Sequence, residues 1–287
     1  MSYCKAPSPV IYDKRCLEYC APGHPERPER VSETAALLER EKFAFVKPPP
    51  ADDSDILLSH SGELLETVRR GGFYEPDTPA HENIYEIALL SAGGAIRAAE
   101  LAKDSKNSFS LMRPPGHHAT RDNLMGFCYF NNITIAALKV FKGKRVAVID
   151  FDCHHGNGTE DILKGRENFL YVSLHQSPGY PGTGLVSSGN IRNFPLPPGT
   201  GGIAYLCALG RALRGVEEFN PDYIGVSAGF DSYRGDPLMA MALDEGDFGK
   251  IGEMIKGLAK PVFSVLEGGY SPDLPRLILA YLSGLAG

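Results

Sequence analysis

Three features that the sequence lacks narrow the class of protein. No apolar run reaches the roughly 18 residues that a membrane span needs. The N-terminal MSYCKAPSPV has no basic segment followed by an apolar one, so we expect no signal peptide. Lysine and arginine form no basic run and the formal net charge is −6, which argues against direct nucleic-acid binding. We therefore expect a cytoplasmic protein that contacts neither a membrane nor nucleic acid.

The spacing of the cysteines gives no sign of a site built on CxxC pairs. The six cysteines of the 287-residue chain form no CxxC pair, so we interpret them as reduced thiols. Three of them, Cys4, Cys16 and Cys20, lie near the start of the chain. Their role stays open, with a local disulfide or a small metal site as the alternative.

The chain does contain apolar runs that alternate with helical patterns, and it has no repeat or low-complexity segment. The runs predict strands at 108–112, 145–152, 168–175, 222–228 and 261–266. The patterns predict helices at 28–41, 62–70, 84–103, 131–141, 204–219, 244–258 and 271–285. Helices between strands indicate parallel strands joined by crossovers, and continuous apolar runs indicate a sheet covered on both faces. We predict an α/β fold, with one open, mainly parallel sheet and helices on both faces, in a single domain over residues 1–287.

Unusual polar residues follow every predicted strand. In chain order, the segments after the strands read RPPGHHAT, DFDCHHGNG, HQSPGYPGTG, AGFDSYRGDPL and EGGYSPD. Ligands of open α/β sheets bind beyond the carboxyl ends of the strands. The sequence therefore predicts one site at that end of the sheet.

Three of these polar residues have the chemistry of a divalent-metal site. Asp152 and His154 are two apart on an extended chain, which places both side chains on one face, and Asp231 follows another strand at the same end. Two carboxylates and one imidazole suit an ion such as zinc and leave a position open for water or substrate. Cys153 points to the opposite face and is a poor fourth ligand. Buried hydrogen bonds explain each acid singly, but they do not explain why the acids gather at one sheet end.

Two histidines and a tyrosine could supply acid–base chemistry beside this set. His117 and His118 follow Pro-Pro-Gly at the same end, and we expect a general acid/base role rather than a surface or capping role. Asp150 could hold one imidazole by its second nitrogen. Tyr270, on the turn EGGY, can donate a hydrogen bond to an oxyanion, with simple packing as the alternative. Two aromatic residues could wall an apolar slot or belong to the core: Phe127 and Tyr180.

Seven motifs, in order along nearly the whole chain, carry a resemblance to one family. They are HPERPERV at 24–31, RPPGHHA at 113–119, GFCYFNN at 126–132, DFDCHHGNGT at 150–159, SLHQSPGYPGTG at 173–184, AGFDSYRGDPL at 228–238 and EGGY at 267–270. The chain resembles the histone deacetylase and acetylpolyamine amidohydrolase family, and looks like a minimal, prokaryotic, class II-like member. The resemblance implies an arginase-like α/β fold.

The resemblance also implies a role for each matching residue. The zinc ligands would be Asp152, His154 and Asp231. The catalytic groups would be the general base His118, its electrostatic partner His117 held by Asp150, the oxyanion donor Tyr270, and Asn157. The substrate would be contacted by Asp77, Gly126, Phe127, Tyr180, Leu238, Gly268 and Gly269, with Arg30 beneath the acetate pocket. A structural potassium ion would be bound by Asp150, Asp152, His154, Ser173 and Leu174.

Three positions depart from related patterns. Asn157 replaces an aspartate that the first class of the family pairs with the second histidine, so it should favour the charged imidazole less. Leu238 replaces a methionine that lines the inner pocket of that class. Gly156 stands where an arginase-type enzyme with two manganese ions needs a further carboxylate, which indicates one catalytic metal.

From the resemblance we expect a zinc-dependent deacetylase that hydrolyses acetyl-lysine or a related N-acetyl amine to the free amine and acetate. An acetylpolyamine amidohydrolase is the alternative enzyme. A non-catalytic acyl-lysine reader is the alternative from another class, but His118 and Tyr270, which such a reader would be expected to lose, are both present. Fe²⁺ stays possible as the native metal. We expect a monomer, because the chain has no long inserted loop.

Overall fold

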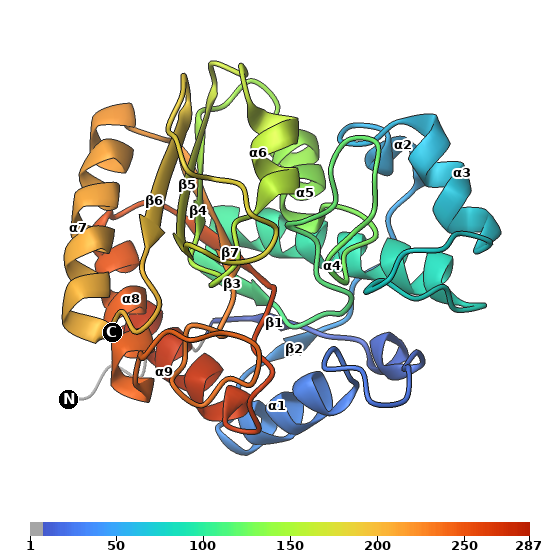
Figure 1. Cartoon of the computed structure of the whole chain (residues 1–287), viewed down its shortest axis with the longest axis horizontal. Coiled ribbons are helices and arrows are strands. Elements are labelled where there is room, and N and C mark those ends of the chain that lie inside the picture. The colour runs from blue at the N-terminus through green and yellow to red at the C-terminus, as the bar shows by residue number, and fades with distance from the viewer. Residues whose placement is uncertain (1–7) are drawn as a thin grey trace.

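A single sheet of eight strands forms the centre of the molecule (Figure 1). This computed structural model describes residues 8–287. The strands are β1 (Val10–Ile11), β2 (Phe45–Val46), β3 (Asn107–Ser110), β4 (Val146–Asp150), β5 (Phe169–Gln176), β6 (Ile191–Leu196), β7 (Tyr223–Ala228) and β8 (Val262–Leu266). Their order is β2-β1-β3-β8-β7-β4-β5-β6, and every neighbouring pair is parallel. The predicted open sheet is confirmed, and it is wholly rather than mainly parallel.

Helices cover both faces of this sheet. They are α1 (Glu29–Arg40), α2 (Asp53–Ile56), α3 (Gly62–Arg70), α4 (Ile84–Ser105), α5 (Asn132–Val140), α6 (Asn157–Leu163), α7 (Gly202–Phe219), α8 (Glu245–Gly257) and α9 (Leu274–Ala286). Helices α1, α7, α8 and α9 contribute to one apolar cluster, and α2 to α6 contribute to the other. Along β4, Ala147 and Ile149 belong to the first cluster, while Val146 and Val148 belong to the second. This alternation explains the continuous apolar run: side chains on both faces of a covered strand are buried.

The predicted elements match the observed ones closely, but six short ones were missed. The predicted strands and helices all exist, with ends that differ by a few residues. The missed elements are β1, β2, β6, α2, α6 and the short 3-10 helix η1 (Lys14–Leu17). Strands β1 and β2 have two residues each, too few for a periodic pattern. Strand β6 lies at the sheet edge and contains Pro195, which is compatible with an edge strand but weakens the sequence signal.

The cysteine question is partly answered. Cys16 is a buried free thiol and Cys20 is an exposed one, so they do not form a disulfide with each other. Cys4 lies outside the described residues. Among residues 8–287, the one cluster with metal-ligand geometry contains no cysteine. Within the same residues, no helix is long and apolar enough to cross a membrane.

Strand order explains how the site is assembled. Strands β8, β7 and β4 are neighbours in the middle of the sheet. Because parallel strands end at the same edge, the loops after Asp150, Ala228 and Leu266 start side by side. Residues far apart in the sequence therefore meet where these three strands end.

Candidate metal centre and active site

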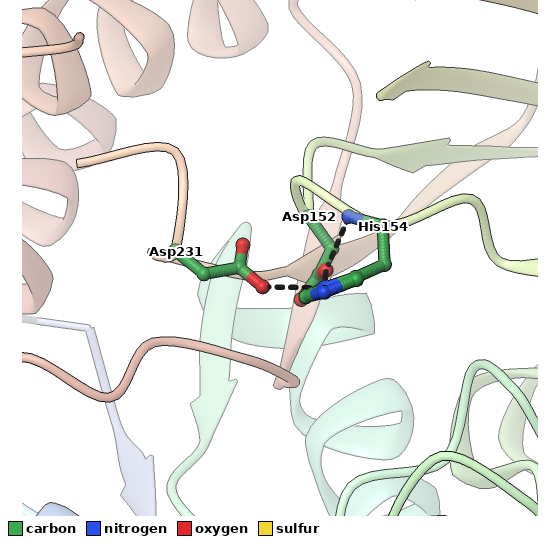
Figure 2. A group of neighbouring side chains, drawn as sticks. All are labelled: Asp152, His154 and Asp231. Atoms are coloured by element: carbon green, nitrogen blue, oxygen red, sulfur yellow. Dashed lines mark hydrogen bonds and ion pairs between the residues drawn. The ribbon is translucent and has the colours of Figure 1, made fainter. Parts of the chain in front are cut away.

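The loops after β4 and β7 bring three ligand-type side chains together (Figure 2). Asp152 and His154 come from the first loop and Asp231 from the second. One potential ligand atom from each residue lies within 4.8 Å of the others. Nδ1 of His154 is 2.7 Å from Oδ2 of Asp231 and 3.1 Å from Oδ1 of Asp152. This is the set that the sequence predicts.

Main-chain groups orient both carboxylates. Oδ1 of Asp231 accepts the N–H of Cys153 at 2.7 Å, and Oδ2 of Asp152 accepts the N–H of Gly268 at 2.7 Å. Oδ1 of Asp152 also accepts the N–H of His154 at 2.8 Å, so the backbone fixes both oxygens of Asp152 and one oxygen of Asp231. Room for this arrangement comes from glycine, because a Cβ at Gly229 would lie 1.9 Å from Oδ2 of Asp152.

The electrostatics of this cluster fit a divalent cation. Both aspartates are fully buried. Burial, followed by the charge of Asp152, raises the pKa of Asp231 to about 7. Oδ2 of Asp231 is buried, and no donor in residues 8–287 hydrogen-bonds to it in acceptable geometry. An orphaned carboxylate oxygen facing an imidazole nitrogen and a second carboxylate is a donor set for an ion such as zinc.

His117 and His118 lie in the loop between β3 and α5, with ring centroids 4.1 Å apart. Nδ1 of His117 is 3.1 Å from Oδ2 of Asp150, and Nδ1 of His118 is 2.8 Å from Oδ1 of Asn157. An amide oxygen only accepts, so Nδ1 of His118 carries the proton and its Nε2 is free to accept one. Both contacts were predicted as pairings from the sequence.

The two histidines are driven to opposite charge states. Burial alone would lower the pKa of His117, but Asp152 and Asp150 raise it to about 10. Burial, reinforced by the positive charge of His117, holds the pKa of His118 well below its ordinary value. His117 is therefore a cation at neutral pH and His118 a neutral base. Asn157 is neutral, so unlike an aspartate it adds no negative charge that would raise the pKa of His118.

Tyr270 is presented by the loop after β8. Its N–H donates to Oδ2 of Asp236 at 2.7 Å, and the Arg30 guanidinium lies 4.7 Å from its ring centroid. Arg30 also donates to the carbonyl oxygens of Glu267 and Gly269, at 2.6 Å each. Burial raises the pKa of Tyr270, so the phenol keeps its proton and can act as a donor.

A cavity of about 190 Å³ leads to this group. It is lined by Asp77, Pro115, His117, His118, Gly126, Phe127, His154, Tyr180, Leu238, Gly268 and Tyr270. The Phe127 ring stands edge-on to Tyr270 at 5.7 Å, and the Tyr180 ring edge-on to His118 at 5.2 Å. Of the predicted substrate residues, Arg30 and Gly269 do not line this cavity. Instead, Arg30 lies against the Tyr270 ring and donates to the carbonyl of Gly269, the residue before Tyr270.

Asp77 lines the cavity next to the turn that carries Phe127. Its Oδ1 accepts the N–H of Gly126 at 3.0 Å, and neighbouring Thr78 accepts the N–H of Phe127 at 2.9 Å. Phe127 has a φ of 67°, an uncommon conformation for a non-glycine residue. These bonds hold the strained turn that points Phe127 into the cavity.

The residues of the predicted potassium site also lie together. Asp150 and Ser173 are register partners on β4 and β5, and Leu174 follows on β5. Oγ of Ser173 pairs with Nδ1 of His175 at 2.8 Å, while Oδ2 of Asp150 accepts the hydroxyl of Tyr171 at 2.8 Å. The potassium assignment stays a prediction.

Sequence reasoning missed the buried acids that support the site. Asp236 accepts the N–H of Leu238 at 2.9 Å as well as that of Tyr270. Glu26 pairs with Arg30 at 3.0 Å and with Arg113 at 2.6 Å. These acids, and Glu267, stand inside the quoted motifs, but a motif does not show which backbone N–H or guanidinium a buried acid meets.

Comparison with known proteins gives a consistent result. The model of the histone deacetylase domain matches residues 24–285. A "Probable deacetylase" of Methanothermobacter thermautotrophicus is 43% identical over 92% of this chain and 86% of that protein. A "Histone deacetylase-like amidohydrolase" of Pseudomonas aeruginosa is 40% identical over 93% of this chain and 78% of that protein.

The fold comparison agrees. The crystal structure of an acetylpolyamine aminohydrolase from Burkholderia pseudomallei aligns with a TM-score of 0.90 and 28% sequence identity, covering 98% of this chain and 99% of that one. The family match, the relatives and the shared sheet cover the loops that build the site. The chain belongs to the histone deacetylase family.

Proposed function

We propose that this protein is a zinc-dependent amidohydrolase that releases acetate from an N-acetyl amine, with acetyl-lysine in protein as the first candidate. One observation carries the proposal. A donor set for a divalent cation borders the cavity through His154, and a neutral histidine and a protonated tyrosine line the same cavity. These are the groups that hydrolysis of an amide needs.

The mechanism follows from these positions. A zinc ion held by Asp152, His154 and Asp231 would polarise the acetyl carbonyl and acidify the attacking water. Nε2 of His118 takes the proton of that water and later returns it to the leaving amine. The Tyr270 hydroxyl donates to the oxyanion, and cationic His117, held by Asp150, adds positive charge nearby.

The cavity walls suggest what enters. Phe127, Tyr180 and Leu238 present apolar surface, which suits the aliphatic chain of an acetylated amine. Asp77 in the cavity wall suits a backbone N–H of a peptide or a second amine.

An acetylpolyamine substrate is the second candidate. Asp77 and Glu75 lie together, because Oε2 of Glu75 accepts the N–H of Asp77 at 2.9 Å. Burial and the neighbouring Asp77 raise the pKa of Glu75, and a cation would relieve this repulsion between the two carboxylates. The fold likeness to an acetylpolyamine aminohydrolase also supports this candidate.

A direct comparison separates the two. We would measure kcat/KM on one zinc-loaded preparation with an acetyl-lysine peptide, N-acetylspermidine and N-acetylputrescine. A peptide preference of orders of magnitude indicates a protein deacetylase, and the reverse indicates a polyamine enzyme. If zinc binds and none of the three is hydrolysed, the proposed function is wrong and the acyl-lysine reader becomes the better hypothesis.

Several finer predictions from the sequence stay proposals. They are the single catalytic domain over residues 1–287, a structural potassium ion, Fe²⁺ as an alternative native metal, a monomeric state and a cytoplasmic location. Metal analysis of protein purified without added metal tests the ions. Light scattering on the eluting peak of a sizing column tests the monomer.

A further inference from the structure

Glu267 is a fully buried acid at the carboxyl end of β8 that the mechanism above does not use. Its Oε2 accepts the N–H of Gly116 at 2.7 Å and that of His117 at 3.1 Å. Its Oε1 accepts the hydroxyl of Ser227 at 3.0 Å. Three donors converge on one carboxylate, and two of them belong to the loop that carries the catalytic histidines.

We propose that Glu267 is a positioning residue: its side chain fixes the histidine loop (residues 113–118) relative to Tyr270. This inference rests on the proposed function, because it concerns the distance between the general base and the oxyanion donor. Tyr270 follows Glu267 by three residues on the same loop. Glu267 therefore connects the loop that carries the two histidines to the loop that carries Tyr270.

The contacts of Glu267 leave little freedom at either end. Its own N–H donates to the Ala228 carbonyl at 2.9 Å, and its carbonyl accepts from Arg30 at 2.6 Å. On the other side, a Cβ at Gly116 would lie 2.5 Å from the Asn132 nitrogen, so this backbone is pressed against α5. The loop is thus clamped between α5 and the Glu267 side chain.

The N–H groups of Gly116 and His117 depend on this acid. Within the part of the chain that the structure describes, neither has another acceptor. Without Glu267, two buried donors would be unsatisfied and the loop would shift to find partners. A shift of about 1 Å in a catalytic group costs on the order of a hundredfold in rate.

The test compares two substitutions of similar size. Glu267→Gln keeps an amide oxygen for both N–H groups and an amide NH₂ that can donate to Ser227. Glu267→Met keeps the length and removes every acceptor. We expect Glu267→Gln to retain most of kcat, whereas Glu267→Met lowers kcat between tenfold and a hundredfold with KM within about twofold. Zinc content should match the wild type in both variants.

Hydrogen exchange supplies a readout that does not require activity. Mass spectrometry of a peptide spanning residues 113–120 should show faster amide exchange in Glu267→Met and near-wild-type protection in Glu267→Gln. Val216→Ala, at a buried position of α7 that does not line the cavity, controls for general loss of stability and should leave kcat unchanged.

Either of two outcomes overturns the inference. One is a folded, zinc-loaded Glu267→Met with wild-type kcat and protection. The other is a Glu267→Gln variant as impaired as Glu267→Met, which would make charge the property that matters.

If Glu267→Met does not fold, Glu267→Asp replaces it, since it keeps the charge but shortens the reach by one methylene. A wild-type kcat in Glu267→Asp would also refute positioning. If the wild type hydrolyses no substrate, the proposed function fails, while the exchange comparison still tests the loop contact.

Discussion

Removing the Tyr270 hydroxyl is predicted to abolish most of the activity at almost no cost in stability. The ring of Tyr270 packs against Arg30 and Phe127, and Tyr270→Phe keeps both contacts. Within residues 8–287 the hydroxyl makes no hydrogen bond to the protein, so its loss leaves no partner unsatisfied. The hydroxyl is therefore free to serve the reaction alone.

The expected magnitude follows from the loss of one oxyanion donor. Such a loss lowers kcat by about a hundred- to a thousandfold, or about 2.7–4 kcal/mol of transition-state stabilisation. The free energy of unfolding should change by less than about 0.5 kcal/mol. The assay is initial-rate kinetics on the better of the two substrate classes, together with urea denaturation of the same preparation.

Tyr281→Phe is the matched control. Tyr281 is buried on α9, and its hydroxyl pairs with Oγ of Ser264 at 2.9 Å. Its removal should cost about 1–3 kcal/mol of stability, because Ser264 loses its partner in the core, and should leave kcat unchanged. Tyr270→Phe should therefore lose activity and keep its stability, whereas Tyr281→Phe should lose stability and keep its activity. A Tyr270→Phe enzyme with near-wild-type kcat would refute the oxyanion role.

Three further predictions address the metal, the acid range and a remote loop. Asp231→Ala should lower bound zinc from about one per chain to background in elemental analysis, and a full equivalent retained would exclude Asp231 as a ligand. Burial would raise the pKa of Glu26, but Arg113 and Arg30 overcome this and lower it to about 2. Because the folded pKa lies below the unfolded one, the ionised Glu26 adds on the order of 3 kcal/mol to the free energy of unfolding above about pH 4.5. This contribution is lost as pH falls toward 2. Acid denaturation curves of Glu26→Gln should lack this loss. Nδ2 of Asn190 donates to the carbonyls of Leu163, Arg166 and Phe169 at 2.9, 3.2 and 3.0 Å. Asn190→Ala should therefore lower the free energy of unfolding in urea by about 1–3 kcal/mol and leave kcat intact. An unchanged urea midpoint would show that water replaces the amide.

The central strands could be predicted because each one has an apolar pattern that is visible in its own short stretch of sequence. Strands β4, β7 and β8 are buried on both faces, so each is a continuous apolar run that ends where polar residues begin. The same ends located the site, since Asp152, Asp231 and Tyr270 each follow one of these strands. The two-residue strands and the edge strand with Pro195 lack such a pattern and become strands only through their neighbours in the sheet.

The supporting contacts could not be predicted from local patterns. Glu267 meets Gly116 across 151 positions of sequence, and Arg113 meets Glu26 across 87. Arg30 was predicted beneath the acetate pocket, which stays a prediction, but its bonds to the carbonyls of Glu267 and Gly269 in the loop after β8 were not predicted. Which backbone group a buried charge meets depends on how loops from different strands pack, and no short spacing encodes this.

The measurement that tests the central claim most directly is a zinc titration of chelator-stripped protein, with turnover of an acetylated amine recorded at each step. Residues 8–287 contain one donor set, Asp152, His154 and Asp231, and Gly156 stands where a second metal would need a carboxylate. We therefore predict activity that rises linearly and stops at one equivalent. Activity that is independent of metal, or that requires two equivalents, would contradict the account.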